Sequence, residues 1–474
     1  MREAGSVVVV CVVAVVAAAA SGGVASRDAR ASPALHVDGG FFRDADGGVV
    51  ILRGVNVAGD SKMPPFRPVT GPSFFDPLAG WGMNVVRLLF TWEAYEPEKG
   101  VYDQSYLDYY ASAVDAAASR GLAVIVDFHQ DAFSRWSVGG CGSGLPGWAI
   151  PPWVWKSTPD NGPRCHGWGA SMIIDIGMHL SWGAFHRDET GARTRYLAMV
   201  KRVAARFADR DAVIGYDFMN EPWGDEPTEL YRLYEDAAAA IRAADPSAIL
   251  FVSPHALISA GGKSGLRKPS FGNFAFSPHI YDPAVVTLGS WPGGTLDGPF
   301  GNMRGVAQAW GVPLFVGEFG AEAGVGNVGA YVRTLYEQLD RGLSSGAQWV
   351  FTPGWAPGRK DGWNGEDLSI NDGAGAARAN FAPRPYPRRV AGTPTRFAVA
   401  LPADVAGRAV ELDWQHDPGA GLTEIFVPAR ALFGTANLAI ATTGGAVCAA
   451  FDDRVRCAAT GAGAVSVRIT AGAP

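Results

Sequence analysis

The sequence carries little charge of either sign. Asp, Glu, Lys and Arg make up 18% of its 474 residues, the formal net charge is −6, and there is no long basic or acidic run. Nothing in this composition attracts a phosphate backbone, so no nucleic-acid partner is predicted. Apolar residues reach 48% of the chain, enough for a large core. The length suits a large barrel, alone or followed by a smaller module.

No apolar run is long enough for a comfortable membrane span of about 20 residues. A Val- and Ala-rich run at 7–20 follows Arg2 and leads into small residues that end at Ser26. This layout predicts a signal peptide over residues 1–26 and therefore a secreted, extracellular protein. The alternative is an N-terminal anchor that is retained.

Cysteine is scarce, with five in the chain, and Cys11 lies inside the apolar run. The other four are an even number in an exported chain, which predicts disulfides, although buried free thiols are an alternative. Three pairings are conceivable, and proximity in sequence favours Cys141–Cys165 and Cys448–Cys457. No histidine lies at ligand spacing from either pair, so no zinc or other metal site is predicted.

Eight short apolar segments rich in β-branched residues recur along the first 383 residues, and helix-like stretches separate most of them. Several, such as 123–128, are continuously apolar, which is typical of parallel strands buried on both faces. Eight such units predict an α/β fold, a closed (β/α)₈ TIM barrel spanning 33–383. The expected strands are 49–56, 84–90, 122–129, 213–221, 249–253, 274–281, 313–319 and 348–352. The expected helices are 106–119, 193–207, 230–244, 301–309 and 328–341.

The character of the sequence changes after residue 383. Prolines and arginines crowd 384–394, which predicts a proline-rich linker. From 395 to 474 apolar and polar residues alternate between glycine-rich turns, which predicts a small C-terminal antiparallel β-sandwich. Its expected strands are 395–401, 409–414, 422–428 and 464–470.

Polar residues gather at or just after the C-terminal ends of the predicted barrel strands. That end of a TIM barrel carries the active site, and so many polar residues at one end are unusual for stability alone. The residues are Asn56, Arg87, His129, Asn220, Glu221, His279, Tyr281 and Glu318.

Two of these residues are glutamates that suit glycoside cleavage. Glu221 ends the fourth predicted strand and Glu318 ends the seventh, so they can converge across the barrel mouth. A retaining glycosidase needs two carboxyl groups about 5–5.5 Å apart, one as acid/base and one as nucleophile. We assign Glu221 as the acid/base and Glu318 as the nucleophile. Glu322 lies beyond the strand end and ranks lower; a helix cap at Glu221 or a loop salt bridge at Glu318 is the alternative.

The other strand-end residues suit the tuning of these acids. Arg87 can hold Glu318 in its ionised form, and Tyr281 can donate to it. Glu221 must retain its proton near neutral pH. His129 and His279 are candidates for sugar hydroxyl contacts, with structural histidines as the alternative.

Asn220 precedes the predicted acid and is well placed to hold the sugar 2-hydroxyl. A metal site built from His129, Asp131 and His279 is conceivable but not favoured. The chemistry needs no cofactor.

Taken together, these motifs resemble glycoside hydrolase family 5, and its endoglycoceramidases most closely. The resemblance rests on Asn220-Glu221-Pro222 and on 317–320 for the family. For the subgroup it rests on 52–56 leading to Lys62, and on 127–136, 141–146, 277–283, 384–388 and 391–394.

The resemblance implies hydrolysis, with retention, of the bond between an oligosaccharide and ceramide. The implied partner is a glycosphingolipid or another glycoside, reached through transient contact with a membrane surface or micelle, and a monomer is expected. It also implies that a tryptophan after the eighth strand contacts the sugar, for which we choose Trp355 over Trp349. Further implied sugar contacts are Lys62, His129, Asp131, Asn220 and Tyr281.

Two loops fit a lipid-linked substrate. One follows the third strand and is crowded with tryptophans, which stack on sugars, bind acyl chains or simply pack together. The other, 287–302, is expected to line a ceramide groove or act as a lid. Alternative functions are another family 5 β-glycosidase acting on polysaccharide or simple glycolipid, and a non-catalytic carbohydrate-binding protein. The tryptophans are Trp136, Trp148, Trp153, Trp155 and Trp168.

Overall fold

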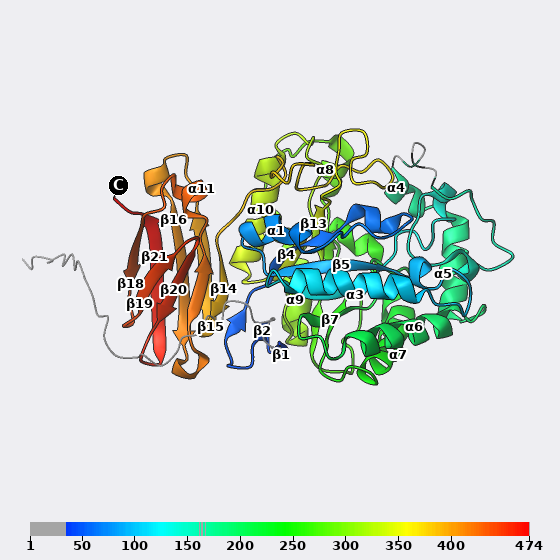
Figure 1. Ribbon diagram of the computed structural model, residues 1–474, viewed down its shortest axis with the longest axis horizontal. Helices are drawn as coiled ribbons and strands as arrows, with labels where there is room; N and C mark the ends of the chain where they lie inside the picture. The colour runs from blue at the N-terminus through cyan, green and yellow to red at the C-terminus, as the bar shows by residue number, and fades with distance from the viewer. Residues whose placement is uncertain (1–34, 161, 163–164, 166, 474) are drawn as a thin grey trace, which may run out of the picture.

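The computed structural model describes residues 35–473 except 161, 163, 164 and 166. Figure 1 shows a barrel surrounded by helices and, beside it, a smaller body built of strands. The predicted signal peptide, 1–26, lies outside the described residues. Within the part of the chain that is described, none of the helices combines the length and the apolar character needed to cross a bilayer.

The barrel is an eight-stranded parallel sheet in the order β11-β13-β4-β5-β6-β7-β8-β9. A bridge between Phe276 and Leu314, and the parallel pair β10 and β12, join its two edges. The sheet is thereby nearly closed, which confirms the predicted TIM barrel. The strands are β4 Arg53–Val57, β5 Val85–Thr91, β6 Ala123–His129, β7 Val213–Asp217, β8 Ile249–Val252, β9 Phe274–Phe276, β10 His279–Ile280, β11 Phe315–Val316, β12 Glu318–Phe319 and β13 Ser345–Phe351.

Helices cover the outside of the barrel and bury one face against it. In α3, for example, the N-cap Asp103 accepts from the Tyr106 amide, and Tyr106, Tyr110 and Val114 face the core at helical spacing. The helices are α1 Asp76–Gly80, α2 Trp92–Tyr95, α3 Gln104–Ala118, α4 Trp168–Met172, α5 Ile176–His186, α6 Ala192–Phe207, α7 Tyr231–Arg242, α8 Pro283–Leu288, α9 Asp297–Trp310 and α10 Val328–Arg341, while α11 Ala429–Phe433 belongs to the C-terminal body.

An N-terminal hairpin closes the barrel at the end opposite the strand C-termini. Its strands are β1 His36–Asp38, β2 Phe41–Arg43 and β3 Val49–Val50. Leu35 and Phe42 are buried with the apolar residues of the barrel floor, and the rings of Phe42 and Phe251 are 6.1 Å apart. Through β3 the same hairpin pairs with β14 of the sandwich.

The C-terminal body is the predicted antiparallel sandwich, but it is larger than the sequence indicated. One sheet has the order β1-β2-β3-β14-β17-β20-β19 and the other β15-β16-β21-β18. Trp414, Val410 and Ile425 are among the residues buried between them. The strands are β14 Tyr386–Val390, β15 Gly392–Ala400, β16 Ala409–His416, β17 Thr423–Phe426, β18 Leu438–Thr442, β19 Val447–Phe451, β20 Arg454–Ala458 and β21 Gly463–Ala471.

The prediction of a proline-rich linker at 384–394 is wrong. Residues 386–390 form β14, in the middle of a sheet, and β15 begins at Gly392. Pro387 fits the strand because the pairing with β17 shifts register between Pro387 and Arg389. Proline is tolerated in a sheet at such an irregularity.

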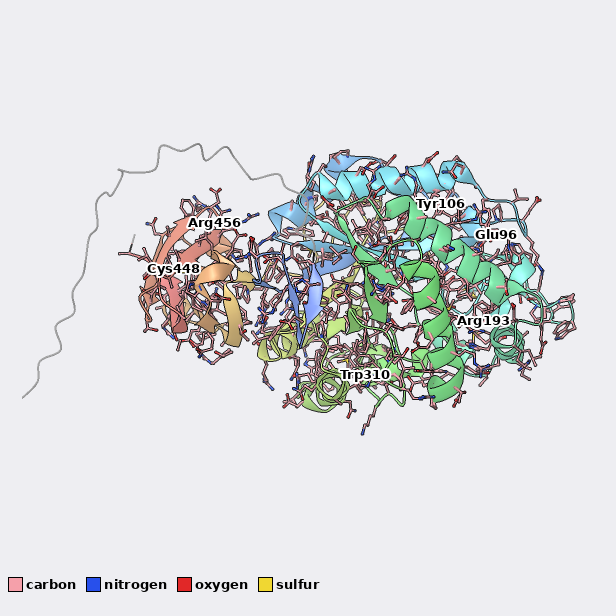
Figure 2. The ribbon with its side chains drawn as sticks, turned by 90° about the horizontal axis from the view of Figure 1, so that it is seen from below. Glu96, Tyr106, Arg193, Trp310, Cys448 and Arg456 are labelled. Atoms are coloured by element: carbon pink, nitrogen blue, oxygen red, sulfur yellow. A yellow bond between two sulfur atoms is a disulfide. The ribbon has the colours of Figure 1, made fainter. Side chains whose placement is uncertain are left out.

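Both predicted disulfides are present. Cys141–Cys165 closes part of the loop after β6 with the Cα atoms 5.5 Å apart, and Cys448–Cys457 joins β19 to β20 with the Cα atoms 4.1 Å apart. Figure 2 labels Cys448 in the sandwich. The first disulfide therefore restrains a loop at the barrel mouth, and the second restrains a hairpin far from it.

Candidate active site

The predicted site residues converge at the C-terminal end of the barrel strands. His129 is the last residue of β6, Glu221 follows β7, His279 begins β10 and Glu318 begins β12. His279 and Glu318 are register partners in the β10–β12 pair. The parallel strands thus deliver these side chains to one place, as the barrel requires.

Arg87 lies on β5 beneath this cluster and is completely buried. Burial alone lowers the pKa of Arg87, but the carboxylates of Asp127 and Asp217 outweigh it and raise the pKa, so the guanidinium stays charged. Its nitrogens donate to Asp217 Oδ2 (3.1 Å), Asn56 Oδ1 (2.9 Å), Glu318 Oε1 (2.8 Å), Asp127 Oδ1 (2.9 Å) and Asn220 Oδ1 (2.9 Å).

Glu318 has a hydrogen-bond donor on each carboxylate oxygen. Arg87 donates to Oε1 at 2.8 Å, and the Tyr281 hydroxyl donates to Oε2 at 2.9 Å. The residue is 4% exposed. Such contacts stabilise the anionic form, which is what a nucleophile needs.

Glu221 has a different environment. Burial, reinforced by the Asp131 carboxylate, raises the pKa of Glu221 to about 7. Its Oε1 lies 3.0 Å from His279 Nδ1. The backbone at Glu221 has φ of 40°, a conformation that side-chain-bearing residues seldom adopt and that often marks functional positions. A carboxyl group that retains its proton near neutral pH suits a general acid.

The two acids are close enough for retention. A carboxylate oxygen of Glu221 and one of Glu318 lie within 4.8 Å of each other. Inverting glycosidases hold their carboxyl groups about 6.5–9.5 Å apart to admit a water molecule, and retaining ones about 5–5.5 Å apart. Glu322, the competing candidate, is exposed beyond the strand end.

His279 links the two acids as a neutral side chain. Burial lowers the pKa of His279 to about 4 in spite of the nearby Glu318. Its Nδ1 is 3.0 Å from Glu221 and 3.6 Å from Glu318. Although one atom each from His279 and the two glutamates could in principle ligate a cation, the Arg87 guanidinium on Glu318 disfavours a second positive charge there.

A chain of charged side chains lines the other side of the site. Lys62 Nζ lies 2.7 Å from Asp131, whose Oδ2 is 3.1 Å from His129 Nε2, and His129 Nδ1 is 2.7 Å from Asp127. Burial lowers the pKa of His129, but the two aspartates prevail and raise it to about 9. The chain is buried, with Lys62 only 3% exposed.

Of the two tryptophans considered for the sugar contact, Trp349 lies beside these residues and Trp355 does not. The Trp349 ring stacks on His129 at 5.4 Å, and Lys62 Nζ lies 4.2 Å from its centroid. Trp355 donates to Asp367 and lies under Arg378, in the loop after β13. These contacts favour Trp349 over our choice of Trp355 as the ring beside the sugar, because β13 ends at Phe351 and places Trp349 at the mouth.

Sequence reasoning missed two further residues near Lys62, Trp363 and Glu366. The Trp363 ring lies 4.0 Å from Lys62 Nζ, and Trp168 donates to Glu366 Oε1 at 3.0 Å. Both Trp363 and Glu366 belong to the loop after β13, which carries no recognised motif. The available signal was the cluster of tryptophans and acidic residues in the sequence, and it was too general to single out Trp363 and Glu366.

The tryptophan-rich loop after β6 divides into two groups. Trp136, Trp148 and Trp168 pack against the barrel core. Trp153 and Trp155 are 61% and 87% exposed. Of the 287–302 insertion, residues 289–296 connect α8, which ends at Leu288, to α9, which begins at Asp297.

Comparison with known proteins agrees with this geometry. Residues 44–161 and 163–352 match the family model for cellulase (glycosyl hydrolase family 5), and 384–470 match the glycoside hydrolase family 5 C-terminal domain. The structure of Endo-glycoceramidase II from Rhodococcus sp. in its ganglioside GM3 complex is similar, with a TM-score of 0.77 and 27% identity over 92% of this chain and 100% of that one. An endogalactoceramidase structure has a TM-score of 0.70 and 25% identity over 93% and 100%.

Curated relatives match over shorter stretches. Endoglycoceramidase I of Rhodococcus hoagii is 29% identical over 270 residues, which is 52% of each chain. A glucosylceramidase of Rhizopus delemar is 27% identical over 247 residues, 40% of this chain and 35% of that protein. The chain thus spans about half the length of the first relative and about a third of the second. By the match of its barrel and its sandwich, the protein belongs to glycosyl hydrolase family 5.

Proposed function

We propose that this protein is a retaining β-glycosidase that cleaves the bond between glycan and ceramide in glycosphingolipids. The observation that carries this proposal is the pair of carboxyl groups within 4.8 Å of each other, one ion-paired to Arg87 and the other raised in pKa to about 7.

The chemistry is a double displacement. Glu318 attacks the anomeric carbon while Glu221 transfers its proton to the departing ceramide oxygen, and a glycosyl–enzyme ester forms. Glu221, now ionised, removes a proton from water, and the resulting nucleophile releases the sugar from Glu318. Asn220 Nδ2 donates to the Gln130 carbonyl at 2.9 Å. Its second amide hydrogen is left for the sugar 2-hydroxyl.

A lipid-linked substrate is supported by an exposed apolar rim on the loop after β6. We define this apolar rim as Trp153, Trp155, Ile173, Ile174 and Ile176, each more than half exposed. Val154 packs close to Gly177, so the two ends of the rim lie together. Contiguous exposed apolar residues mark contact with membranes or partners, and we propose that the rim touches the membrane or micelle that presents the substrate.

A narrow sugar pocket is supported by the burial of its walls. Lys62 and Glu318 are nearly inaccessible, whereas an enzyme acting on polysaccharide needs a long open cleft. The two catalytic carboxyl groups argue against a non-catalytic carbohydrate-binding protein. The names of the relatives, which include endoglycoceramidases and a glucosylceramidase, favour a ceramide-linked glycan over polysaccharide.

We also propose that the protein is secreted and acts as a monomer. Secretion is supported by the signal-like sequence at 1–26 and by the two disulfides, which persist in oxidising compartments. A monomer suffices because one chain supplies both acids, Arg87 and Lys62.

The test is incubation with purified gangliosides, globosides and galactosylceramides, followed by analysis of both products. Release of intact glycan together with free ceramide is expected, with a Glu318→Gln variant as the inactive control. Release of single sugars from the outer end would indicate a simple glycolipid exo-hydrolase instead. Cleavage of β-glucan without release of ceramide would support the polysaccharide alternative.

A further inference from the structure

A third carboxyl group, Glu366, faces the sugar side of the site and has no part in the double displacement. It is partly buried in the loop after β13, and it interacts electrostatically with Lys62, Asp131 and Glu318. Lys62, the cation of this group, is already paired with Asp131 at 2.7 Å. Glu366 therefore adds a negative charge near Lys62, whose positive charge is already paired with Asp131.

Two loops hold Glu366 in position. The Trp168 indole donates to its Oε1 at 3.0 Å, and the Trp168 and Trp363 rings meet edge to face at 4.9 Å. Asn364 Nδ2 donates to the Cys141 carbonyl at 2.7 Å, which ties the loop after β13 to the disulfide-bonded loop after β6. A carboxylate with this support does not need a substrate to order it.

The second oxygen of Glu366 is free to accept from a ligand. Among the described residues, no hydrogen bond reaches Oε2, while Oε1 is occupied by Trp168. Glu366 interacts with Lys62 and Asp131, two residues that the resemblance to the endoglycoceramidases implies contact the sugar. We therefore assign this side of the site to the glycan, while ceramide departs with the proton from Glu221.

We propose that Glu366 is a specificity-determining residue that accepts hydroxyl hydrogen bonds from neutral sugars and disfavours glycans carrying an anionic group. This inference rests on the proposed function and names the class of glycan that the same site prefers. A carboxylate accepts from sugar hydroxyls, and a like charge nearby costs binding energy that Lys62, already paired, does not offset.

The pH dependence of Glu366 protonation provides a second test of its role. Burial raises the pKa of Glu366 to about 7, with Lys62 and the Trp168 hydrogen bond acting in the opposite direction. The other charged groups that act on this loop region are Asp131, Glu318 and Asp361. The discrimination should therefore weaken as the pH falls below neutrality, because a protonated Glu366 no longer repels an anion.

The experiment compares an aryl β-lactoside with its 3′-sialylated form, which differ only in the anionic sugar. The two substrates have the same leaving group and are cleaved by the same two acids. The ratio of their kcat/KM values therefore reports the effect of the glycan alone. Glu366→Gln retains an oxygen for Trp168 and should reduce the preference for the neutral substrate by about three- to tenfold. Glu322→Gln removes one charge from the exposed edge of the mouth and should leave the ratio unchanged.

In the wild-type protein the neutral-to-sialylated ratio should rise between pH 5.5 and 8, and this rise should disappear in Glu366→Gln. A ratio that is independent of pH in the wild type and unaffected by Glu366→Gln would overturn the inference while the aryl lactoside is still hydrolysed. No hydrolysis of either substrate, or of any glycolipid, would instead contradict the proposed function.

Discussion

Glu221 and Glu318 lie side by side, but the regions around them differ. Around Glu318, a buried arginine donates to one carboxylate oxygen and a tyrosine hydroxyl donates to the other. Around Glu221, the contact is a histidine whose pKa burial lowers to about 4, so no formal positive charge touches the acid. We therefore propose that the same side chain acts as a nucleophile in one region and as an acid in the other, because its neighbours stabilise different protonation states.

The strongest test of this comparison removes the nucleophile. Glu318→Gln should reduce kcat by about four orders of magnitude or more, because the glycosyl–enzyme ester cannot form. Steady-state kinetics with an aryl β-glycoside measure the loss. Glu322→Gln, at the exposed edge of the same mouth, is the matched control and should retain full activity. A Glu318→Gln enzyme with near-normal turnover would refute the assignment of the nucleophile.

The second test removes the acid. Glu221→Gln should slow hydrolysis of a glycolipid by about 10²–10⁴-fold, because ceramide is a poor leaving group that needs a proton. An aryl glycoside with an acidic phenol should lose far less in its first step, and added azide should restore turnover by replacing water as nucleophile. Equal losses for both leaving groups would mean that Glu221 is not the acid.

The pH profile sharpens the comparison without a mutation. The pKa of Glu221 is about 7 in the folded protein. As the pH rises through that value the acid loses its proton, so kcat/KM on a glycolipid should fall about tenfold per pH unit above neutrality. Measurement between pH 5 and 9 locates the midpoint. A descending limb centred below pH 6 would show that another group controls it.

The smallest expected effect concerns the sugar side of the Glu318 region. Trp349→Phe should reduce kcat/KM by about three- to tenfold, since the smaller ring loses stacking area against the sugar and His129. Trp355→Phe, in the loop after β13, is the matched change and should have less than half this effect on a logarithmic scale. If Trp355→Phe were the more damaging substitution, our original choice of ring would be restored.

The sequence predicted the parts of the molecule that follow a repeating physical rule. Continuous apolar strands such as 123–128 gave the barrel, and parallel topology then placed Glu221 and Glu318 at one end. Neither inference needed knowledge of any side-chain contact.

Residues whose position depends on a local irregularity were not predictable. Trp349 faces the site on a strand whose pairing shifts register between Gln348 and Phe351, so alternation along the strand does not say which ring points inward. Pro387 looked like part of a linker because proline is rare inside sheets, and only a second register shift accommodates it. Glu366 lies in a loop, where neither periodicity nor burial constrains the sequence.

The hairpin at the barrel floor has a consequence for how the chain is made. Its strand β3 has Val49 and Val50 paired with Val390 and Arg389 of β14, and both Val49 and Ile51 belong to the sandwich core. Strand β3 is therefore synthesised more than 300 residues before its partner β14. If synthesis stops before β14, the edge of β3 that pairs with β14 stays uncovered. We therefore expect a protein truncated near residue 384 to be prone to aggregation through this unpaired edge and not to fold as an independent catalytic unit.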